Sequence, residues 1–536
     1  MRFISDRAAR RPDPVSERAK RTNWTFAYGL LSAALVPLAS CDKSVQPTQI
    51  FPPVQASNVD PDAGSWRMIV LTGPDQVSVP APVAPTSAAY VAELAAVKSA
   101  QASATPAQQR AVAYWAGDGV LRWNEIEREL VARYNLPPIP RADGTYPAPD
   151  AENPFGQPEF PFSNPPYAAR AYSYVSVAQY EAMKAAWYWK YRYNRPAPSR
   201  TDPAITTIVK PNDLPSYPSE DAVLSGVTAE MLKLLFPAAV EEITRKAAEQ
   251  REAAVLSGRA TASDVAAGLA LGKAIAALVT VRAGADGMRN AVGTPTQWQG
   301  FADAATSRGE LAWKSLEAPV RPPMLPNFGL VKTWTITPDK LIAVSPPPPP
   351  ATSSVEMRAD VAKVKDIVDH LTRDQVAIAQ KWNDGAGTYT PPGHWNAIAA
   401  DRVRSAQMSE VRASRVFAIL NMAMHDAAVA CWGTKFQYFN PRPTQLDPLI
   451  KTVIGLPNFP AYPSGHSTFS GAGAQVLGYF FPDGASEFAA MADEAGISRV
   501  YGGIHYPTDV QRGLEHGQRI GTAVVTYAKS ELTTAP

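Results

Sequence analysis

Cysteine, histidine and net charge are all scarce in this 536-residue chain. Two cysteines exclude a disulfide-stapled scaffold and a cysteine-rich zinc module. The 51 Lys and Arg residues nearly balance the 49 Asp and Glu residues, and the chain lacks the basic runs that nucleic-acid-binding proteins use. All six histidines follow residue 369, so histidine chemistry, if there is any, belongs to the last third of the chain.

The composition favours a helical protein with a substantial core. Hydrophobic residues make up 46% of the chain and charged residues 19%. Ala-rich stretches with apolar residues at i, i+3 and i+4 recur, for example at 228–236 and 264–282, and no run of alternating β-branched residues interrupts them. These patterns predict an all-α fold, with long loops supplied by the 51 prolines.

The first 41 residues are typical of an export signal. A basic stretch precedes an apolar segment, residues 26–39, which is too short to span a bilayer and has the length of a signal-peptide core. The segment ends in Leu-Ala-Ser-Cys41, which resembles a bacterial lipobox. We therefore expect a periplasmic or cell-surface lipoprotein, with a lipid on Cys41 as its one membrane contact. The alternative is an ordinary signal peptide with an incidental cysteine.

Composition also suggests where the domains begin and end. Residues 42–85 are rich in Pro, Ser, Val and Gln and are expected to form a flexible tether. Residues 345–355 contain five consecutive prolines and are expected to form a polyproline linker. Two helical bundles are then predicted, an N-terminal one at 86–344 and a C-terminal one at 356–536.

The two predicted bundles share a sequence pattern. A shift of 245 residues aligns them without gaps over about ninety positions; it places Tyr217-Pro-Ser219 on Tyr462-Pro-Ser464, and Asp264 on Asp509. We interpret this as two four-helix bundles related by a pseudo-twofold internal repeat.

Three segments of the second half combine positive charge with small and hydroxylic residues. They are 435–443, which contains Lys435 and Arg442, 463–466, which reads Pro-Ser-Gly-His, and 498–509, which begins Ser-Arg499. Arg and Lys suit tetrahedral oxyanions. Ser464 and the unobstructed amide of Gly465 add donors, particularly if a helix begins after Pro463.

The same segments hold two histidines with a carboxylate at helical spacing. His466 and His505 titrate near neutral pH. Asp509 follows His505 by four residues and shares its face if the segment is helical, so it is placed to orient the imidazole. Zinc is the competing interpretation for the histidines, and no HExxH motif or cysteine pair accompanies them.

The first half lacks most of these reactive residues at the corresponding positions. Lys190, Ser219 and Asp264 persist, whereas both arginines and both histidines are replaced, by Ala197, Ala254, Asp221 and Ala260. This loss falls on the reactive groups and spares the scaffold. The sequence therefore predicts one active site, in the second half, and a structural role for the first half.

The three segments resemble the signature K-x6-RP, PSGH, SR-x3-G-x-H-x3-D of the superfamily that joins type 2 phosphatidic acid phosphatases and vanadium-dependent haloperoxidases. The resemblance covers roughly residues 105–530, and the double bundle is more similar to the haloperoxidase branch. It implies an all-α fold with vanadate or phosphate bound inside a helical bundle, and no haem, flavin or nucleotide.

The resemblance also implies roles for the individual residues. His505 would be the axial vanadate ligand, or the nucleophile toward a phosphoester, and His466 the general acid/base. The equatorial oxygens would be held by Lys435, Arg442, Ser464, Gly465 and Arg499. Asp384 would face the site arginines, Trp432 would lie beside the cofactor, and Phe459 would occupy a position that bears on halide preference.

Other histidines are less informative from sequence alone. His394 and His425 are more often satisfied helix residues than site residues, and His370 and His516 are expected on the surface or on a helix face.

Three hypotheses follow for the function. The first is a vanadium-dependent haloperoxidase acting on hydrogen peroxide, halide and an organic acceptor. The second is a phosphomonoesterase that uses the same residues through a phosphohistidine. The third is a non-catalytic lipoprotein that only binds an oxyanion, which the intact second-half constellation argues against.

Overall fold

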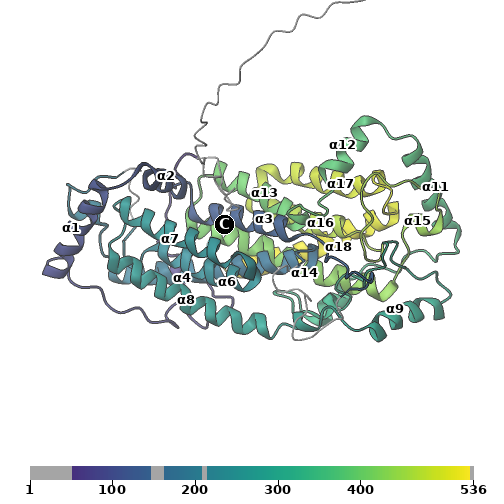
Figure 1. Ribbon diagram of the computed structural model, residues 1–536, viewed down its shortest axis with the longest axis horizontal. Coiled ribbons are helices and arrows are strands. Elements are labelled where there is room, and N and C mark those ends of the chain that lie inside the picture. Colours follow the sequence, from purple (N-terminus) through teal and green to yellow (C-terminus); the bar gives the residue numbers. More distant parts are fainter. Residues whose placement is uncertain (1–50, 147–161, 208–213, 532–536) are drawn as a thin grey trace, which may run out of the picture. The chain divides into compact units, whose positions relative to one another are not determined.

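The computed structural model describes residues 51–146, 162–207 and 214–531, and over these ranges the chain is helical without strands. The predicted leader, residues 1–41, and the predicted lipidation site, Cys41, lie outside the described residues. Figure 1 shows the helices in chain order, purple to yellow. Those of the first half are α1 (Ala88–Ala102), α2 (Pro106–Trp115), α3 (Gly119–Tyr134), α4 (Pro165–Tyr193), α5 (Pro198–Thr201), α6 (Glu220–Leu235), α7 (Val240–Leu256) and α8 (Ala262–Gly284).

The connection and the second half continue the helical pattern. The helices are α9 (Pro295–Ser307), α10 (Pro338–Val344), α11 (Val355–Asp369), α12 (Arg373–Lys381), α13 (Thr390–Ser405), α14 (Glu410–Tyr438), α15 (Pro443–Leu446), α16 (Gly465–Phe480), α17 (Ala485–Tyr501) and α18 (Pro507–Glu531). Five short 3₁₀ turns lie at Ala63–Ser65, Pro237–Ala239, Met288–Asn290, Phe328–Leu330 and Pro482–Gly484.

Helix boundaries in the two halves follow the sequence offset. Helices α4 to α8 each begin 245 residues before α14 to α18, and α4 and α14 both contain 29 residues. Ser219 and Ser464 cap α6 and α16 in the same way, each accepting a hydrogen bond from the amide three residues later. These boundaries fix the order and length of the helices. The pseudo-twofold relation in space stays a prediction.

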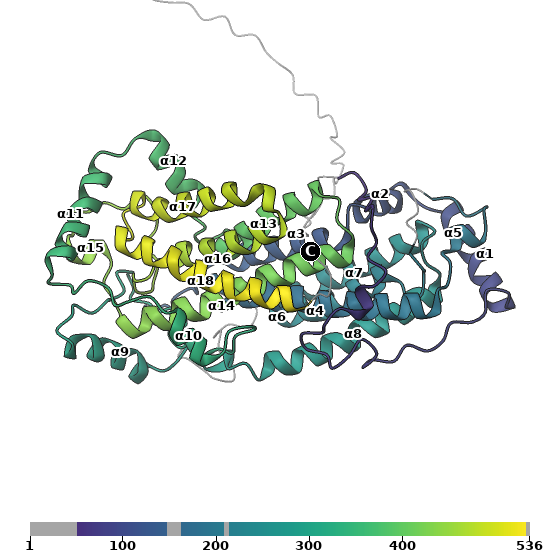
Figure 2. The same cartoon turned by 180° about the vertical axis from the view of Figure 1, so that it is seen from behind.

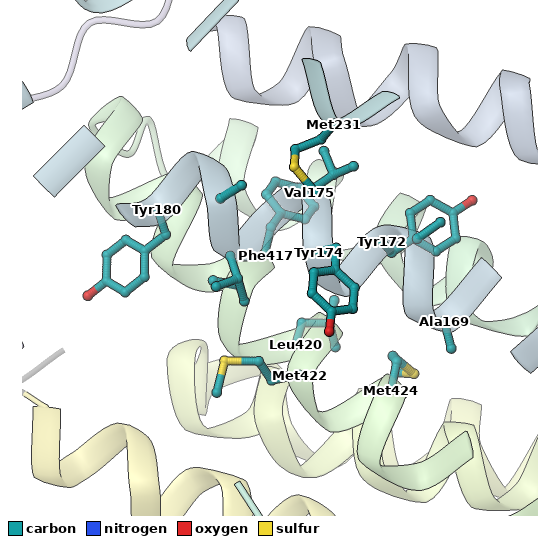
Figure 3. Close-up of a cluster of buried hydrophobic side chains, with 14 of the residues drawn as sticks. Ala169, Tyr172, Tyr174, Val175, Tyr180, Met231, Phe417, Leu420, Met422 and Met424 are labelled. Atoms are coloured by element: carbon teal, nitrogen blue, oxygen red, sulfur yellow. The ribbon is translucent and has the colours of Figure 1, made fainter. Parts of the chain in front are cut away.

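One hydrophobic core includes both halves. The long helices α4 and α14 pack against each other, and both figures place them between the helices of the two halves (Figures 1 and 2). Figure 3 shows buried side chains of this region, among them Tyr172, Tyr174 and Val175 of α4 and Phe417 and Leu420 of α14. All five side chains are at most 1% exposed. Because α4 and α14 bury one another, the predicted bundles are not separately packed bodies.

Residues 51–85 differ from the expected flexible tether. Trp66, Leu71 and Val79 are each 5% exposed and belong to the core. The carboxylate of Glu181 on α4 accepts three consecutive backbone amides, those of residues 69 to 71, at 2.8 to 2.9 Å. Charge-assisted hydrogen bonds of this kind hold an irregular segment in place, which the Pro-rich composition does not reveal.

The predicted linker at 345–355 is also anchored. The hydroxyl of Tyr462 donates to the carbonyl of Pro347, and the amide and hydroxyl of Thr352 both donate to Glu310 at 2.7 Å. The segment is therefore attached to residues of both predicted bundles and does not space them apart. α11 begins inside the predicted linker, at Val355.

Two segments in the described part of the chain are long and apolar enough to cross a membrane by length and composition, Ala262–Gly284 and Glu410–Leu446. The second is 94% buried within the protein, as the core position of α14 requires. The first is 39% buried.

Candidate active site

Four helix ends and two loops bring the predicted site residues together. Lys435 lies in the last turn of α14, Ser464 and Gly465 begin α16, and Arg499 lies in the last turn of α17. Close contact between α16 and α18 depends on glycine, because a Cβ on Gly517 would lie 2.1 Å from the carbonyl oxygen of Thr468. That contact lets the amide of Ser464 donate to the carbonyl of Asp509 at 3.0 Å, which joins the start of α16 to the start of α18.

Lys435 is completely buried at the base of the site. Its Nζ donates to the carbonyl oxygens of Pro460 at 3.0 Å, Ala461 at 2.8 Å and Pro463 at 2.5 Å. Burial lowers the pKa of Lys435 to about 7, and the neighbouring Arg442 acts in the same direction. An anion in the site would reverse this effect by favouring the charged amine.

The two arginines are held by backbone carbonyls. Arg442 is 1% exposed, and its guanidinium donates to the carbonyls of Phe459, at 3.1 and 2.9 Å, and Ile504, at 2.8 Å. Arg499 is also 1% exposed and donates to the carbonyls of Ala379 and Trp382. Burial lowers the pKa of each arginine to about 10, so both stay charged at neutral pH.

His505 is held between a carboxylate and a guanidinium. Its Nδ1 lies 2.8 Å from Asp509 Oδ2, and its Nε2 lies 3.0 Å from Arg442 Nη1. Arg442 can only donate, so Nε2 is the acceptor and Nδ1 carries the proton that is given to Asp509. Burial, together with the charges of Arg442, Lys435 and Arg499, lowers the pKa of His505 well below its usual range. The result is a neutral imidazole whose Nε2 is available as a ligand or nucleophile.

The geometry behind this hydrogen bond differs from the helical spacing expected. His505 precedes the helix, because Pro507 begins α18. Asp509 reaches back from the first turn, where its Oδ2 also accepts the amide of Tyr506 at 3.2 Å. The pair therefore meets through a helix-entry turn and not along a helix face.

His466 lies in a second group of site residues, together with Asp384 and His394. Asp384 Oδ2 lies 3.6 Å from His466 Nε2, and the Asp384 carboxylate also approaches Nδ1 of His394 at 3.1 and 3.3 Å. His394 stacks on Trp382 with ring centroids 4.3 Å apart. His466 Nε2 is buried and lacks a hydrogen-bond partner over the described residues. Burial, Arg499 and His394 lower the pKa of His466 well below its usual range.

His394 is the residue whose role sequence reasoning left open. The residues around His394 did not show whether its side chain enters the site, since His394 lies on α13 and His466 lies on α16. Asp384 links them from a loop, with φ of +43°.

Trp432 and Phe459 form an apolar wall beside these charges. Their rings are 5.0 Å apart, and Lys435 Nζ and Arg442 Cζ lie 5.1 and 5.0 Å from the Phe459 ring. A Cβ on Gly465 would come 3.8 Å from the Trp432 ring. Aromatic faces beside buried cations lower the cost of keeping those cations charged.

The remaining histidines lie outside this group. His370 is exposed, as expected. His516 lies on a buried face of α18, which agrees with the helix-face alternative and not with the surface alternative, and burial lowers its pKa to about 3. His425 is buried with Nε2 3.2 Å from the carbonyl of Lys332.

In the first half, carboxylates neutralise the remaining cations. Lys190, the counterpart of Lys435, lies 2.6 Å from Glu220, which stands where the second half has Gly465. Arg259 contacts Asp221 at 2.7 Å, and Asp221 stands where the second half has His466. At these positions of the first half, the cations are paired with carboxylates and are not available to an oxyanion.

The family model that matches this site is described as the PAP2 superfamily, and it covers residues 416–531. These residues include the Lys435–Arg442, Pro463–His466 and Arg499–Asp509 parts of the site. Residues 416–531 belong to the PAP2 superfamily. Asp384 and His394 lie outside the matched segment.

Curated relatives of this PAP2 segment include two kinds of enzyme. Vanadium chloroperoxidase of Curvularia inaequalis is 28% identical over 121 residues, which is 17% of this chain and 20% of that protein. Lipid A 1-phosphatase of Rhizobium etli is 44% identical over 76 residues, which is 14% of this chain and 32% of that protein. The matches thus span between a fifth and a third of these relatives' lengths.

Solved structures extend the likeness to both halves. A bacterial vanadium-dependent iodoperoxidase superposes with a TM-score of 0.55 at 21% identity, over 77% of this chain and 96% of that one. A bacterial vanadium-dependent chloroperoxidase superposes with a TM-score of 0.50 at 14% identity, over 72% and 96%. The all-α fold predicted from sequence is confirmed, and it is the haloperoxidase-like helical fold.

Proposed function

We propose that this protein is a vanadium-dependent haloperoxidase-like enzyme, which oxidises halide with hydrogen peroxide at a histidine-bound vanadate. The observation that carries the proposal is the state of His505, a neutral imidazole whose Nδ1 is fixed by Asp509 and whose unprotonated Nε2 lies beside Arg442. The likeness of the fold to haloperoxidases across both halves supports the choice within the superfamily.

The residues of the site fit vanadate as a group. Nε2 of His505 is a neutral nitrogen ligand, and Lys435, Arg442 and Arg499 supply three positive charges for the oxyanion. The hydroxyl of Ser464 and the first amides of α16 add neutral donors at a helix N-terminus. Vanadate, when bound, would supply the Lewis acidity that activates peroxide.

The chain itself would supply positive charge to neutralise the anion and a histidine, His466, that can take up and release a proton. The three buried cations are fixed by backbone carbonyls, so their positive charges are held in place before an anion binds. His466 Nε2 has no hydrogen-bond partner and faces Asp384 at 3.6 Å, so it can accept a proton and be stabilised as a cation. We assign it the role of general acid/base, with Asp384 as the carboxylate that favours its protonated form.

A second function is favoured by a specific observation, the 44% identity to lipid A 1-phosphatase over 76 residues. In a phosphomonoesterase, His505 Nε2 would attack phosphorus and form a phosphohistidine, while the alcohol departs with a proton from His466. Lys435, Arg442 and Arg499 would stabilise the negative charge of the trigonal-bipyramidal transition state.

One pair of assays separates the two functions. The purified full chain is tested for halogenation of a dye with peroxide and halide, with and without orthovanadate, and in parallel for hydrolysis of a phosphomonoester. Vanadate-dependent halogenation is expected. Phosphoester hydrolysis without halogenation would reject the first function and support the second.

The variant His505→Ala should abolish whichever activity is found, while His370→Ala, on an exposed histidine, should leave it unchanged. Full activity in His505→Ala would refute the site assignment.

A further inference from the structure

A cavity lined by residues of both halves lies away from the site just described. It has a volume of about 460 Å³ and is bordered by the segment 54–61. Its side chains come from the ends of helices in both halves, and they include Trp115, Asp118, Trp187, Arg259, Met408 and Glu410. None of the proposed vanadate-binding residues lines it.

Two acidic side chains dominate the charge of this cavity. Asp118 caps α3, with Oδ1 accepting the amide of Leu121 at 3.1 Å, and Glu410 begins α14, with Oε1 accepting the amide of Gly119 at 2.8 Å. The helix dipoles of α3 and α14 offset part of the negative charge. Burial and the neighbouring acids raise the pKa of Asp118 to about 7 and that of Glu410 well above its usual range.

The nearby cations are already paired with other carboxylates. Arg259 contacts Asp221 at 2.7 Å, and Lys190 contacts Glu220 at 2.6 Å. Arg404, which also faces Asp118, contacts Asp401 at 3.0 Å. Asp118 and Glu410 are therefore the carboxylates left without an ion-pair partner around the cavity within the described ranges.

Asp118 has a buried acceptor oxygen without a donor in the described part of the chain. Its side chain lines the cavity and is 3% exposed, and its second oxygen, Oδ2, is buried without a hydrogen-bond partner over the described residues. A buried carboxylate oxygen with no donor costs free energy unless a ligand supplies one.

We propose that this cavity binds a small organic cation, whose ammonium or guanidinium group donates to Asp118 Oδ2 and to Glu410. A bound cation would favour the charged form of both carboxyl groups, and carboxylates accept such donors strongly. Trp115, Trp187 and Met408 in the lining suit the apolar body of an organic cation. A metal ion fits less well, because the described residues contain no group of three side chains able to hold one.

The test measures binding of two defined probes, 1,4-diaminobutane and tetramethylammonium, to the purified full chain by isothermal titration calorimetry. The variants are Asp118→Asn and Glu410→Gln. Asn is as good a helix cap as Asp and tolerates the positive φ of +81° at this position, so the fold is preserved. Diaminobutane, which can donate to both carboxylates, is expected to bind at least tenfold more weakly to each variant than to the parent chain.

Two controls make the result specific. Asp366→Asn removes an exposed carboxylate on α11 and should bind as the parent does. His505→Ala, which should lack the proposed enzymatic activity, should also bind as the parent does, so this proposal and the proposed function can fail independently. Absence of binding by both probes up to about 10 mM would overturn the proposal. Binding of diaminobutane to both carboxylate variants with the affinity of the parent chain would overturn it too.

Discussion

Replacing Asp384 by asparagine isolates the charge that controls His466. Asparagine keeps the shape of the side chain and tolerates the left-handed backbone, with φ of +43°, at this position. The substitution therefore removes the negative charge that faces His466, His394 and Arg499 while disturbing the backbone little.

The size of the effect follows from the distance between the two side chains. The Asp384 carboxylate lies 3.6 Å from His466 Nε2. At an effective dielectric constant of about 20, the attraction of a carboxylate for a protonated imidazole at that distance is at most about 4–5 kcal/mol. Opposite charges this close usually shift a pKa by about 1–3 units. Asp384→Asn should therefore lower the pKa of His466 by about that amount.

The consequence is measurable in the pH dependence of kcat/KM. If protonated His466 is required, its loss at high pH sets the alkaline limb of the profile, and that limb should move to lower pH by about 1–3 units in Asp384→Asn. His394→Gln should move it the other way, because the charge of His394 lowers the pKa of His466 and glutamine keeps a donor for Asp384. An unchanged profile in Asp384→Asn, or shifts of the same sign in both variants, would refute this reasoning.

Three further predictions concern Lys435, the helix contact and the leader. Burial lowers the pKa of Lys435 to about 7, so affinity for orthovanadate or phosphate should weaken above pH 7 by up to about tenfold per pH unit. The variant Lys435→Arg stays charged, so calorimetric titrations should show a smaller dependence of its affinity on pH. Parallel curves of affinity against pH for the two proteins would contradict this prediction. Gly517→Ala should lower stability to denaturant by roughly 1–3 kcal/mol and also reduce activity. The matched change Gly272→Ala, where a Cβ would lie 2.3 Å from the carbonyl of Val223, should cost similar stability and spare activity; equal activity losses in the two variants would argue against a site confined to the second half. Cys41→Ser should move the chain from the membrane fraction to the soluble fraction of an expressing bacterium, and an unchanged distribution on immunoblots would reject the lipid anchor.

Local sequence signals predicted the helical class and indicated a helix start after Pro463. Ser464 as the cap of α16 follows from Pro-Ser-Gly-His, since serine accepts the orphan amides of a first turn. The apolar period of 228–236 lies almost wholly within α6, which ends at Leu235, and the phenylalanine that follows caps it.

Long-range packing limited what the sequence could show. The composition of 51–85 and 345–355 suggested unstructured chain. It does not reveal that the distant carboxylates of Glu181 and Glu310 accept backbone amides of these segments. His394 illustrates the same limit for the site. Its position depends on how α13 lies against α16, and no spacing within residues 390–396 encodes that contact.

The burial of α4 against α14 has a consequence for how this chain can be divided. A fragment consisting of residues 345–536 would carry the whole PAP2 segment yet expose Phe417, Leu420 and their neighbours to water, and such a surface drives aggregation. Supplied with residues 1–344 as a separate polypeptide, the same fragment would find its missing core partner in α4. The first half thus completes the core of the second, a packing role that holds whether or not it binds a ligand of its own.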